Sequence, residues 1–149
     1  MTALAENNRA RFDYEIIQTL TTGMVLRGFE VKALRASRMN LAGSFGQIRG
    51  GKLWLLNADI PPFQPANTPD GYDQKRTREL LVNKKELLEI ARELKSSHLT
   101  LVPLKVYDSH GVLKLELALA RPKKKGDKRE AIRKKETKRE INRSLRSDK

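Results

Sequence analysis

The stretch LTLVPLKVYDSHGVLKLELALA, residues 99–120, decides the fold of this chain. In residues 112–120 apolar and polar side chains alternate, which is the period of two typical of a strand with one buried face. Residues 99–107 form a second apolar run, and the DSHG segment between the two runs (108–111) consists of turn-forming residues. The stretch therefore predicts two antiparallel strands joined by a short turn.

A helix is predicted immediately upstream, over residues 84–95. Asn83 stands at the position of an N-cap, and Glu86 follows three residues later, as in a capping box. We expect the apolar stripe of this helix to cover the end or the side of a β-structure. The short apolar run 80–82 before it predicts another strand. The stripe consists of Leu87, Leu88, Ile90, Ala91 and Leu94.

A hairpin and a long loop are predicted in the middle of the chain. Residues 44–48 and 52–58 flank Gly50-Gly51, and a Gly-Gly pair between two β-rich runs is a strong hairpin signal. Residues 61–72 (PPFQPANTPDGY) are rich in proline, which supplies no hydrogen-bond donor to a sheet, so they predict a loop.

The N-terminal part predicts two further strands, over residues 12–19 and 24–26, with a turn at Thr22-Gly23 between them. Residues 1–11 are polar, and we expect them to be loosely held. About six strands and two helices result for the whole chain. Strands linked by hairpins favour antiparallel pairing, and a closed barrel protects their edges. We therefore predict a mainly β fold with flanking α-helices, an OB-fold-like antiparallel barrel.

The second predicted helix covers residues 28–37 (GFEVKALRAS), where apolar and charged residues fit two helical turns better than a strand. Lys32, Arg35 and Arg38 form its basic face. Such a face is either an RNA contact or an ordinary solvated surface, and charge alone does not decide between them.

Most of the charge of the chain lies in its last residues, 121–149. They hold fourteen Lys and Arg against five Asp and Glu, an excess of nine positive charges, while the whole chain carries +13. Helix-forming residues dominate after Asp127, but Ile132 and Ile141 point to opposite sides of a helix, so there is no apolar stripe for docking. We predict a body, 1–120, and a basic tail that is disordered when free and helical on a polyanion. The alternative is a tail that only aids solubility.

Composition limits the function further. The pI of about 10.2 indicates RNA, DNA or an anionic membrane surface as a partner. There is no run of eighteen apolar residues and no apolar signal core near the N-terminus, so we expect neither a membrane span nor export. The chain has no Cys, which excludes disulfides and Cys-based zinc sites and agrees with a cytoplasmic location.

No constellation of residues points to catalysis. His98 and His110 both fall in predicted loops, and the carboxylates, Glu30 among them, lie among Lys and Arg as surface ion pairs do. Residues 46–53 resemble a P-loop, but Leu53 replaces the Ser or Thr that binds Mg²⁺, and the segment joins two strands. The sequence predicts a binding protein rather than an enzyme, with no metal or other cofactor.

Five motifs together resemble the SmpB family of SsrA-binding proteins: NNRARFDYEI from Asn7, GFEVKALRAS from Gly28, RTRELLVNKKEL from Arg76, LTLVPLKVY from Leu99 and DKREAIRKKE from Asp127. They occur in the family's order over nearly the whole chain. The resemblance implies an OB-like barrel that binds the tRNA-like domain of tmRNA and delivers alanyl-tmRNA to stalled ribosomes for trans-translation. It also implies that the tail enters the empty mRNA channel of the small subunit, near the decoding region, and folds there as a helix.

The resemblance places tmRNA-binding positions at Asn7 and Leu81. A third, usually acidic, position falls on Thr21, which is not expected to make the same contact. Some relatives carry His before the Asp-Lys-Arg motif of the tail, and Gly126 here offers no ring for base stacking, which is worth about 1–3 kcal/mol. By charge we add Arg9, Arg11, Lys32, Arg35, Arg76 and Arg78 as phosphate contacts. The predicted ribosome contacts of the tail are Lys123, Lys124, Lys125, Asp127, Lys128, Arg129, Arg133, Lys134, Lys135, Lys138, Arg139, Ile141 and Leu145.

The sequence leaves two alternative hypotheses for the function open. A generic OB-type RNA-binding or ribosome-associated protein would bind many RNAs with similar affinity. A DNA-compacting basic protein would show no preference for an L-shaped RNA over duplex DNA. Aromatic residues make up only 5% of the chain, which favours recognition of RNA by shape over an extended stacking platform. We expect a monomer that binds neither membranes nor a small-molecule substrate.

Overall fold

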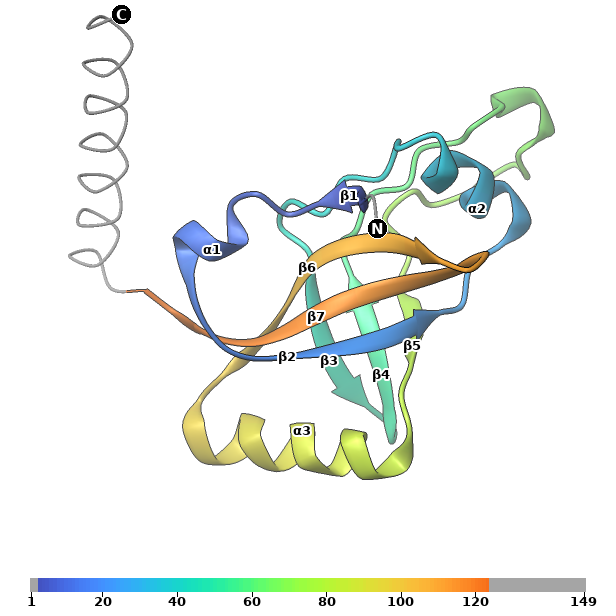
Figure 1. The fold of residues 1–149 in the computed structure, drawn as a ribbon. Coiled ribbons are helices and arrows are strands. Elements are labelled where there is room, and N and C mark those ends of the chain that lie inside the picture. The colour runs from blue at the N-terminus through green and yellow to red at the C-terminus, as the bar shows by residue number, and fades with distance from the viewer. Residues whose placement is uncertain (1–2, 124–149) are drawn as a thin grey trace, which may run out of the picture.

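The computed structural model describes residues 3–123, which form a β-barrel with three flanking α-helices (Figure 1). The strands are β1 Ala3–Glu6, β2 Tyr14–Met24, β3 Phe45–Arg49, β4 Lys52–Leu56, β5 Arg78–Leu81, β6 Thr100–Ser109 and β7 Val112–Pro122. The helices are α1 Ala10–Asp13, α2 Gly28–Arg35 and α3 Lys84–Ser97, with a 3₁₀ turn at Pro65–Asn67.

Every strand pair is antiparallel, and the sheet closes on itself. The strand order is β1-β6-β3-β4-β5-β2-β7, and pairing of β6 with β7 completes the ring. β6 is long enough to serve three neighbours: Leu101 pairs with β3, Lys105 and Tyr107 pair with β1, and nearly the whole strand pairs with β7. This arrangement confirms the predicted antiparallel barrel, and closure removes most of the exposed edges that an open sheet would have.

The period-two pattern of β7 has the predicted consequence. Leu115, Leu117 and Leu119 are at most 2% exposed and fill the barrel, while the alternate side chains lie outside. The helix α3 covers one end of the barrel (Figure 1), and its Ile90 is buried in the core. Leu88, which the spacing placed in the apolar stripe, instead lies 65% exposed.

The predicted N-cap of α3 is confirmed. The Glu86 backbone N–H donates to Asn83 Oδ1 over 2.8 Å, and the Asn83 side chain donates in turn to the Glu86 carboxylate over 2.7 Å. The hairpin of β3 and β4 around Gly50-Gly51 also forms as predicted, with both glycines at positive φ. Local turn and cap chemistry therefore fixes two of the elements that build the barrel.

Two predictions for the N-terminal part are wrong. Residues 1–11 were expected to be loose, but β1 pairs with β6 and the Asn7 N–H donates to the carbonyl of Leu104 over 2.8 Å. There is no turn at Thr22-Gly23, because β2 runs unbroken alongside β7. Gly23 serves a close approach instead, since a Cβ at this position would lie 3.3 Å from Leu81 Cβ.

Candidate nucleic-acid interface

The outer surface of β1, β6, β7 and β2, which faces the viewer in Figure 1 and is called the front face below, brings several predicted site residues together. Two rows of register partners cross it. The first row consists of Glu6, Lys105, Glu116 and Thr21. The second row consists of Tyr107, Lys114, Gly23 and, on the neighbouring β5, Leu81. Because register partners point to the same side of a sheet, these side chains form one surface.

Leu81 is the apolar end of this surface. Although leucine is apolar, this side chain at the end of β5 is 52% exposed. The absence of a side chain at Gly23 leaves room for it to lie flat beside β2. Thr21 lies one row away and is paired across the sheet with Glu116. The Glu116 carboxylate therefore lies on the strand next to Thr21, and it forms an ion pair with Lys105 over 3.6 Å.

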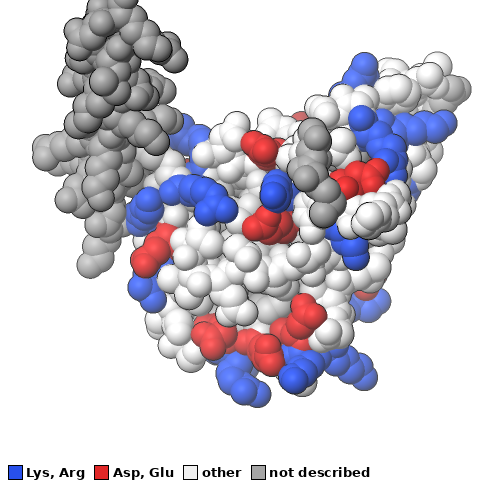
Figure 2. Space-filling view, viewed as in Figure 1, with Lys and Arg blue, Asp and Glu red and all other residues white. Residues whose placement is uncertain are grey.

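Asn7 lies at the other end of the front face, directly after Glu6. Its side-chain amide donates to the carbonyl of Pro103 over 3.0 Å, so β6 holds it in place. Figure 2 shows the same side of the molecule, with acidic and basic side chains close together across its middle and an uncharged area between them and α3. The front face is thus mixed in charge and partly apolar, rather than a uniformly basic patch.

The helix α1 places Arg9 and Arg11 beside this surface. It packs on a small apolar cluster outside the barrel, made of Ala10, Val102, Leu104, Ala118 and Ala120. The guanidinium of Arg9 lies 5.5 Å from the centre of the Phe12 ring and 3.7 Å from the Asp13 carboxylate, and its side chain is 75% exposed. Arg11 is exposed as well. Both remain candidates for phosphate contacts.

Lys123 joins the barrel to the tail at the same helix. Its N–H donates to the carbonyl of Asp13 over 2.9 Å, and its ammonium group donates to the carbonyl of Arg11 over 3.0 Å. β7 continues to Pro122, two residues past the expected end of the body. The other tail residues predicted to contact the ribosome lie outside the described residues: Lys124, Lys125, Asp127, Lys128, Arg129, Arg133, Lys134, Lys135, Lys138, Arg139, Ile141 and Leu145.

The predicted basic face of α2 lies at the turn between β6 and β7, at the end of the front face, and is partly engaged within the protein. Arg35 forms an ion pair with Asp108 and donates to the carbonyl of Gly111 over 3.1 Å, which ties α2 to the β6–β7 turn. The hydrogen bond from Arg35 holds the pKa of Asp108 below its usual value. Arg38 lies over the Phe63 ring at 5.2 Å, whereas Lys32 is exposed.

The expected phosphate contact of Arg78 is wrong, and so is the expected surface position of Glu30. Both are 0% exposed, and the guanidinium of Arg78 donates to the Glu30 carboxylate from Nε over 2.8 Å and from Nη2 over 2.6 Å. Arg76 also donates to Glu30, and its side chain is only 22% exposed. These two arginines neutralise a buried carboxylate and hold the loop before β5 against α2.

Glu30 is held in its charged form. Burial raises its pKa, but hydrogen bonds from Arg76, the Arg27 N–H and Arg78 outweigh burial and lower the pKa from 4.5 to about 2. Tyr72 donates its hydroxyl proton to Glu30 over 2.9 Å, and burial together with this bond raises the tyrosine pKa to about 12. The sequence carried a signal for this cluster, because Glu30 lies three and four residues before the buried Ala33 and Leu34, on the apolar stripe of α2.

Among residues 3–123 the structure brings together no group of three or more His, Cys, Asp or Glu that could hold a metal ion. Within the same residues no helix combines the length and apolar character that crossing a membrane requires.

Comparisons with known proteins agree on one family. The family model described as SmpB protein matches residues 4–147. An SsrA-binding protein of Streptococcus pyogenes serotype M49 is 44% identical over 142 residues, which are 95% of this chain and 91% of the relative. An SsrA-binding protein of Streptococcus uberis is 44% identical over 144 residues, with 97% and 92% covered.

A solved structure is similar over most of the chain. Its description reads "tmRNA-SmpB: a journey to the center of the bacterial ribosome", and its matching chain has a TM-score of 0.67 and 42% sequence identity. The match covers 86% of this chain and 93% of that chain. A family model that spans nearly all residues, close relatives of similar length and a shared barrel leave one conclusion: this chain belongs to the SmpB family.

Proposed function

We propose that this chain binds the tRNA-like domain of tmRNA and delivers alanyl-tmRNA to stalled ribosomes for trans-translation in the bacterial cytoplasm. The similar proteins are named for binding SsrA, and the similar solved structure is a tmRNA–SmpB complex on the ribosome. The observation that carries the proposal for this chain is the front face. The sheet register places Leu81 in the row next to Glu6, Lys105 and Glu116, and Asn7 lines the same hollow as those three residues.

The front face suits a folded RNA better than an extended strand. Leu81 offers an exposed apolar contact for a ribose or a base, and Arg9 and Arg11 extend from the Asn7 end of the surface. Base edges of a paired RNA are poorly accessible, so binding relies on shape and backbone contacts. A mixed surface with cations at one end provides such contacts without reading a sequence.

We also propose a division of labour between the barrel and the tail. The barrel binds tmRNA, and the tail enters the mRNA channel of the small subunit when no message is present. Lys123 supports this division, because its two hydrogen bonds to α1 fix the point at which the tail leaves the barrel, beside Arg9 and Arg11. The excess of positive charge after that point suits a channel walled by RNA.

A gel-shift titration of the full-length protein at physiological salt tests the function. It compares the tRNA-like domain of tmRNA with ordinary tRNA and with duplex DNA. We expect a preference for the tmRNA fragment of about a hundredfold, equivalent to roughly 2.7 kcal/mol. Similar affinities for all three nucleic acids would support the generic RNA-binding protein instead.

Leu81→Asp is expected to lower the affinity for the tRNA-like domain by about tenfold or more, because it removes an apolar contact and adds a negative charge near phosphates. Lys134→Ala, in the tail, is expected to leave this affinity nearly unchanged. Leu88→Asp is the matched control, since Leu88 is 65% exposed on α3, which covers the end of the barrel (Figure 1). The same gel shift measures all three variants, and equal losses for Leu81→Asp and Leu88→Asp would remove Leu81 from the interface.

A further inference from the structure

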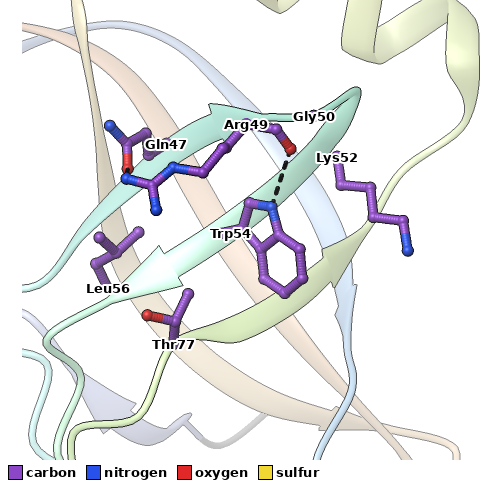
Figure 3. A pocket seen from close by; sticks show the side chains of 7 residues that line it. All are labelled: Gln47, Arg49, Gly50, Lys52, Trp54, Leu56 and Thr77. Atoms are coloured by element: carbon purple, nitrogen blue, oxygen red, sulfur yellow. Dashed lines mark hydrogen bonds between the residues drawn. The ribbon is translucent and has the colours of Figure 1, made fainter.

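A hollow lies on the side of the barrel opposite the front face, on the outer surface of β3, β4 and β5. Its volume is about 390 Å³. These strands lie behind β6, β7 and β2 in Figure 1. Figure 3 shows the side chains that line it, which come from both strands of the hairpin and from the residue before β5: Gln47, Arg49, Lys52, Trp54, Leu56 and Thr77. Nothing in the proposed tmRNA interface uses this surface.

Trp54 is the main apolar feature of the hollow. Its neighbours Leu53 and Leu55 are buried in the barrel, so the alternation of β4 turns the indole outward. The indole N–H donates to the carbonyl of Arg49 over 3.1 Å, which fixes the ring against its own hairpin (Figure 3). With the N–H engaged, the part of the ring left for a partner is its π-face.

Two cations, Arg49 and Lys52, line the same hollow (Figure 3). Arg49 lies across the hairpin from Trp54, and among residues 3–123 its guanidinium donates to a neutral partner only, the side-chain oxygen of Gln47, over 3.0 Å. Lys52 is 59% exposed and lies 3.4 Å from the carboxylate of Glu79, which offsets its charge. The positive charge of Arg49 is therefore not neutralised by this contact, and Arg49 lines the same hollow as the indole.

An aromatic face with a neighbouring guanidinium matches the chemistry of a nucleotide. Bases stack on aromatic side chains whatever their sequence, and the guanidinium pairs with the adjoining phosphate. The net charge of +13 makes a polyanion the natural partner of such a surface. We propose that the hollow binds one unpaired nucleotide of an RNA segment, with the base on Trp54 and a phosphate on Arg49.

Because the hollow and the front face lie on opposite sides of the barrel, this RNA segment is not the one held at Leu81. The chain would then bridge two RNA segments, one recognised by shape and one by an exposed base. The inference does not depend on tmRNA as the partner of the front face.

The experiment uses Trp54 as its own reporter, because it is the only tryptophan of the chain. The full-length protein is titrated at physiological salt with oligoadenylate of about ten nucleotides, a length within the usual site sizes of single-strand binders. We expect saturable quenching of tryptophan fluorescence, since a stacked base contacts the indole. Arg49→Gln is expected to weaken the quenching titration by about tenfold, the loss of one charge-assisted phosphate contact.

Two controls separate stacking from charge attraction. Lys85→Gln removes the same charge from α3 and is expected to leave the titration unchanged. A blunt RNA duplex offers no unpaired base and is expected to quench poorly. Three outcomes would each overturn the proposal. The first is no quenching under conditions in which a labelled oligonucleotide is fully bound. The others are equal weakening of the titration by Arg49→Gln and Lys85→Gln, and equal quenching by the duplex. Leu81→Asp is expected to leave the quenching unchanged. The gel shift therefore tests the front face and the quenching tests the hollow, and either proposal can be contradicted without the other.

Discussion

Glu30→Gln is expected to lower the free energy of unfolding by about 3–5 kcal/mol, the range for removing one partner of a buried ion pair. The glutamine keeps the size of the side chain but loses the charge that faces Arg76 and Arg78. Arg78 is 0% exposed, so its guanidinium would stay buried without a counter-charge. Urea denaturation followed by circular dichroism measures the change.

The matched control is Glu15→Gln. Glu15 is 60% exposed and 3.8 Å from Arg121, so its loss is expected to cost at most about 1 kcal/mol. Acid provides an independent readout. The pKa of Glu30 is lowered from 4.5 to about 2, so its contribution to stability is complete above pH 4.5 and disappears as the pH falls toward 2. The stability difference between wild type and Glu30→Gln should therefore shrink as the pH falls from 4.5 toward 2. A stability difference that stays constant with pH would contradict the argument. So would equally small losses of unfolding free energy in Glu30→Gln and Glu15→Gln.

This buried cluster also bears on the interface. Arg78 is the first residue of β5 and Leu81 is the last. Arg78 donates to the carbonyl of Ala58 over 2.7 Å and to that of Gln74 over 3.0 Å, in addition to Glu30. The cluster thus anchors the beginning of the strand whose other end presents Leu81 on the front face. Arg78, which the sequence predicted as a phosphate contact, instead helps to position Leu81, the proposed RNA contact.

The elements that could be predicted from the sequence are those fixed by local patterns. Alternation defined β7, an apolar run defined β6, the Gly-Gly pair defined the β3–β4 hairpin, and Asn83 with Glu86 defined the start of α3. The missed elements depend on distant partners. β1 is short and has weak periodicity, and it forms because the edge of β6 is available to it. Gly23 looks like a turn residue in the sequence, yet pairing with β7 keeps it extended.

The candidate interface was likewise only partly predictable from the sequence. The resemblance to the family named Asn7 and Leu81, but only the folded sheet places Leu81 near the row of Lys105 and Glu116, beside which Asn7 lies. Charge alone misplaced Arg78, because a basic residue beside a strand looks the same in the sequence whether it binds a phosphate or a buried carboxylate. Trp54 was read only as a strand residue, since its outward position follows from which face of β4 enters the barrel.

Deleting residues 124–149 is expected to leave binding to the tRNA-like domain largely intact and to abolish tagging on stalled ribosomes. The deletion begins after Lys123 because Tyr14 pairs with Pro122 and Lys123 is bound to α1. Removing everything from Arg121 onward would damage the barrel as well. A gel shift measures the first activity, where we expect a loss below about tenfold, or 1.4 kcal/mol. Transfer of the tag on ribosomes stalled at the end of a message measures the second.

A variant in which residues 124–149 are shuffled keeps the charge of the tail but not its order, and so separates charge from sequence. Failure of the shuffled tail to restore tagging would show that the order of residues after Lys123 matters, as expected for a segment that folds along a channel wall. Full restoration would mean that positive charge alone suffices. Equal loss of tmRNA binding and tagging after the deletion would contradict the division itself, because the tail would then belong to the same interface as Asn7 and Leu81.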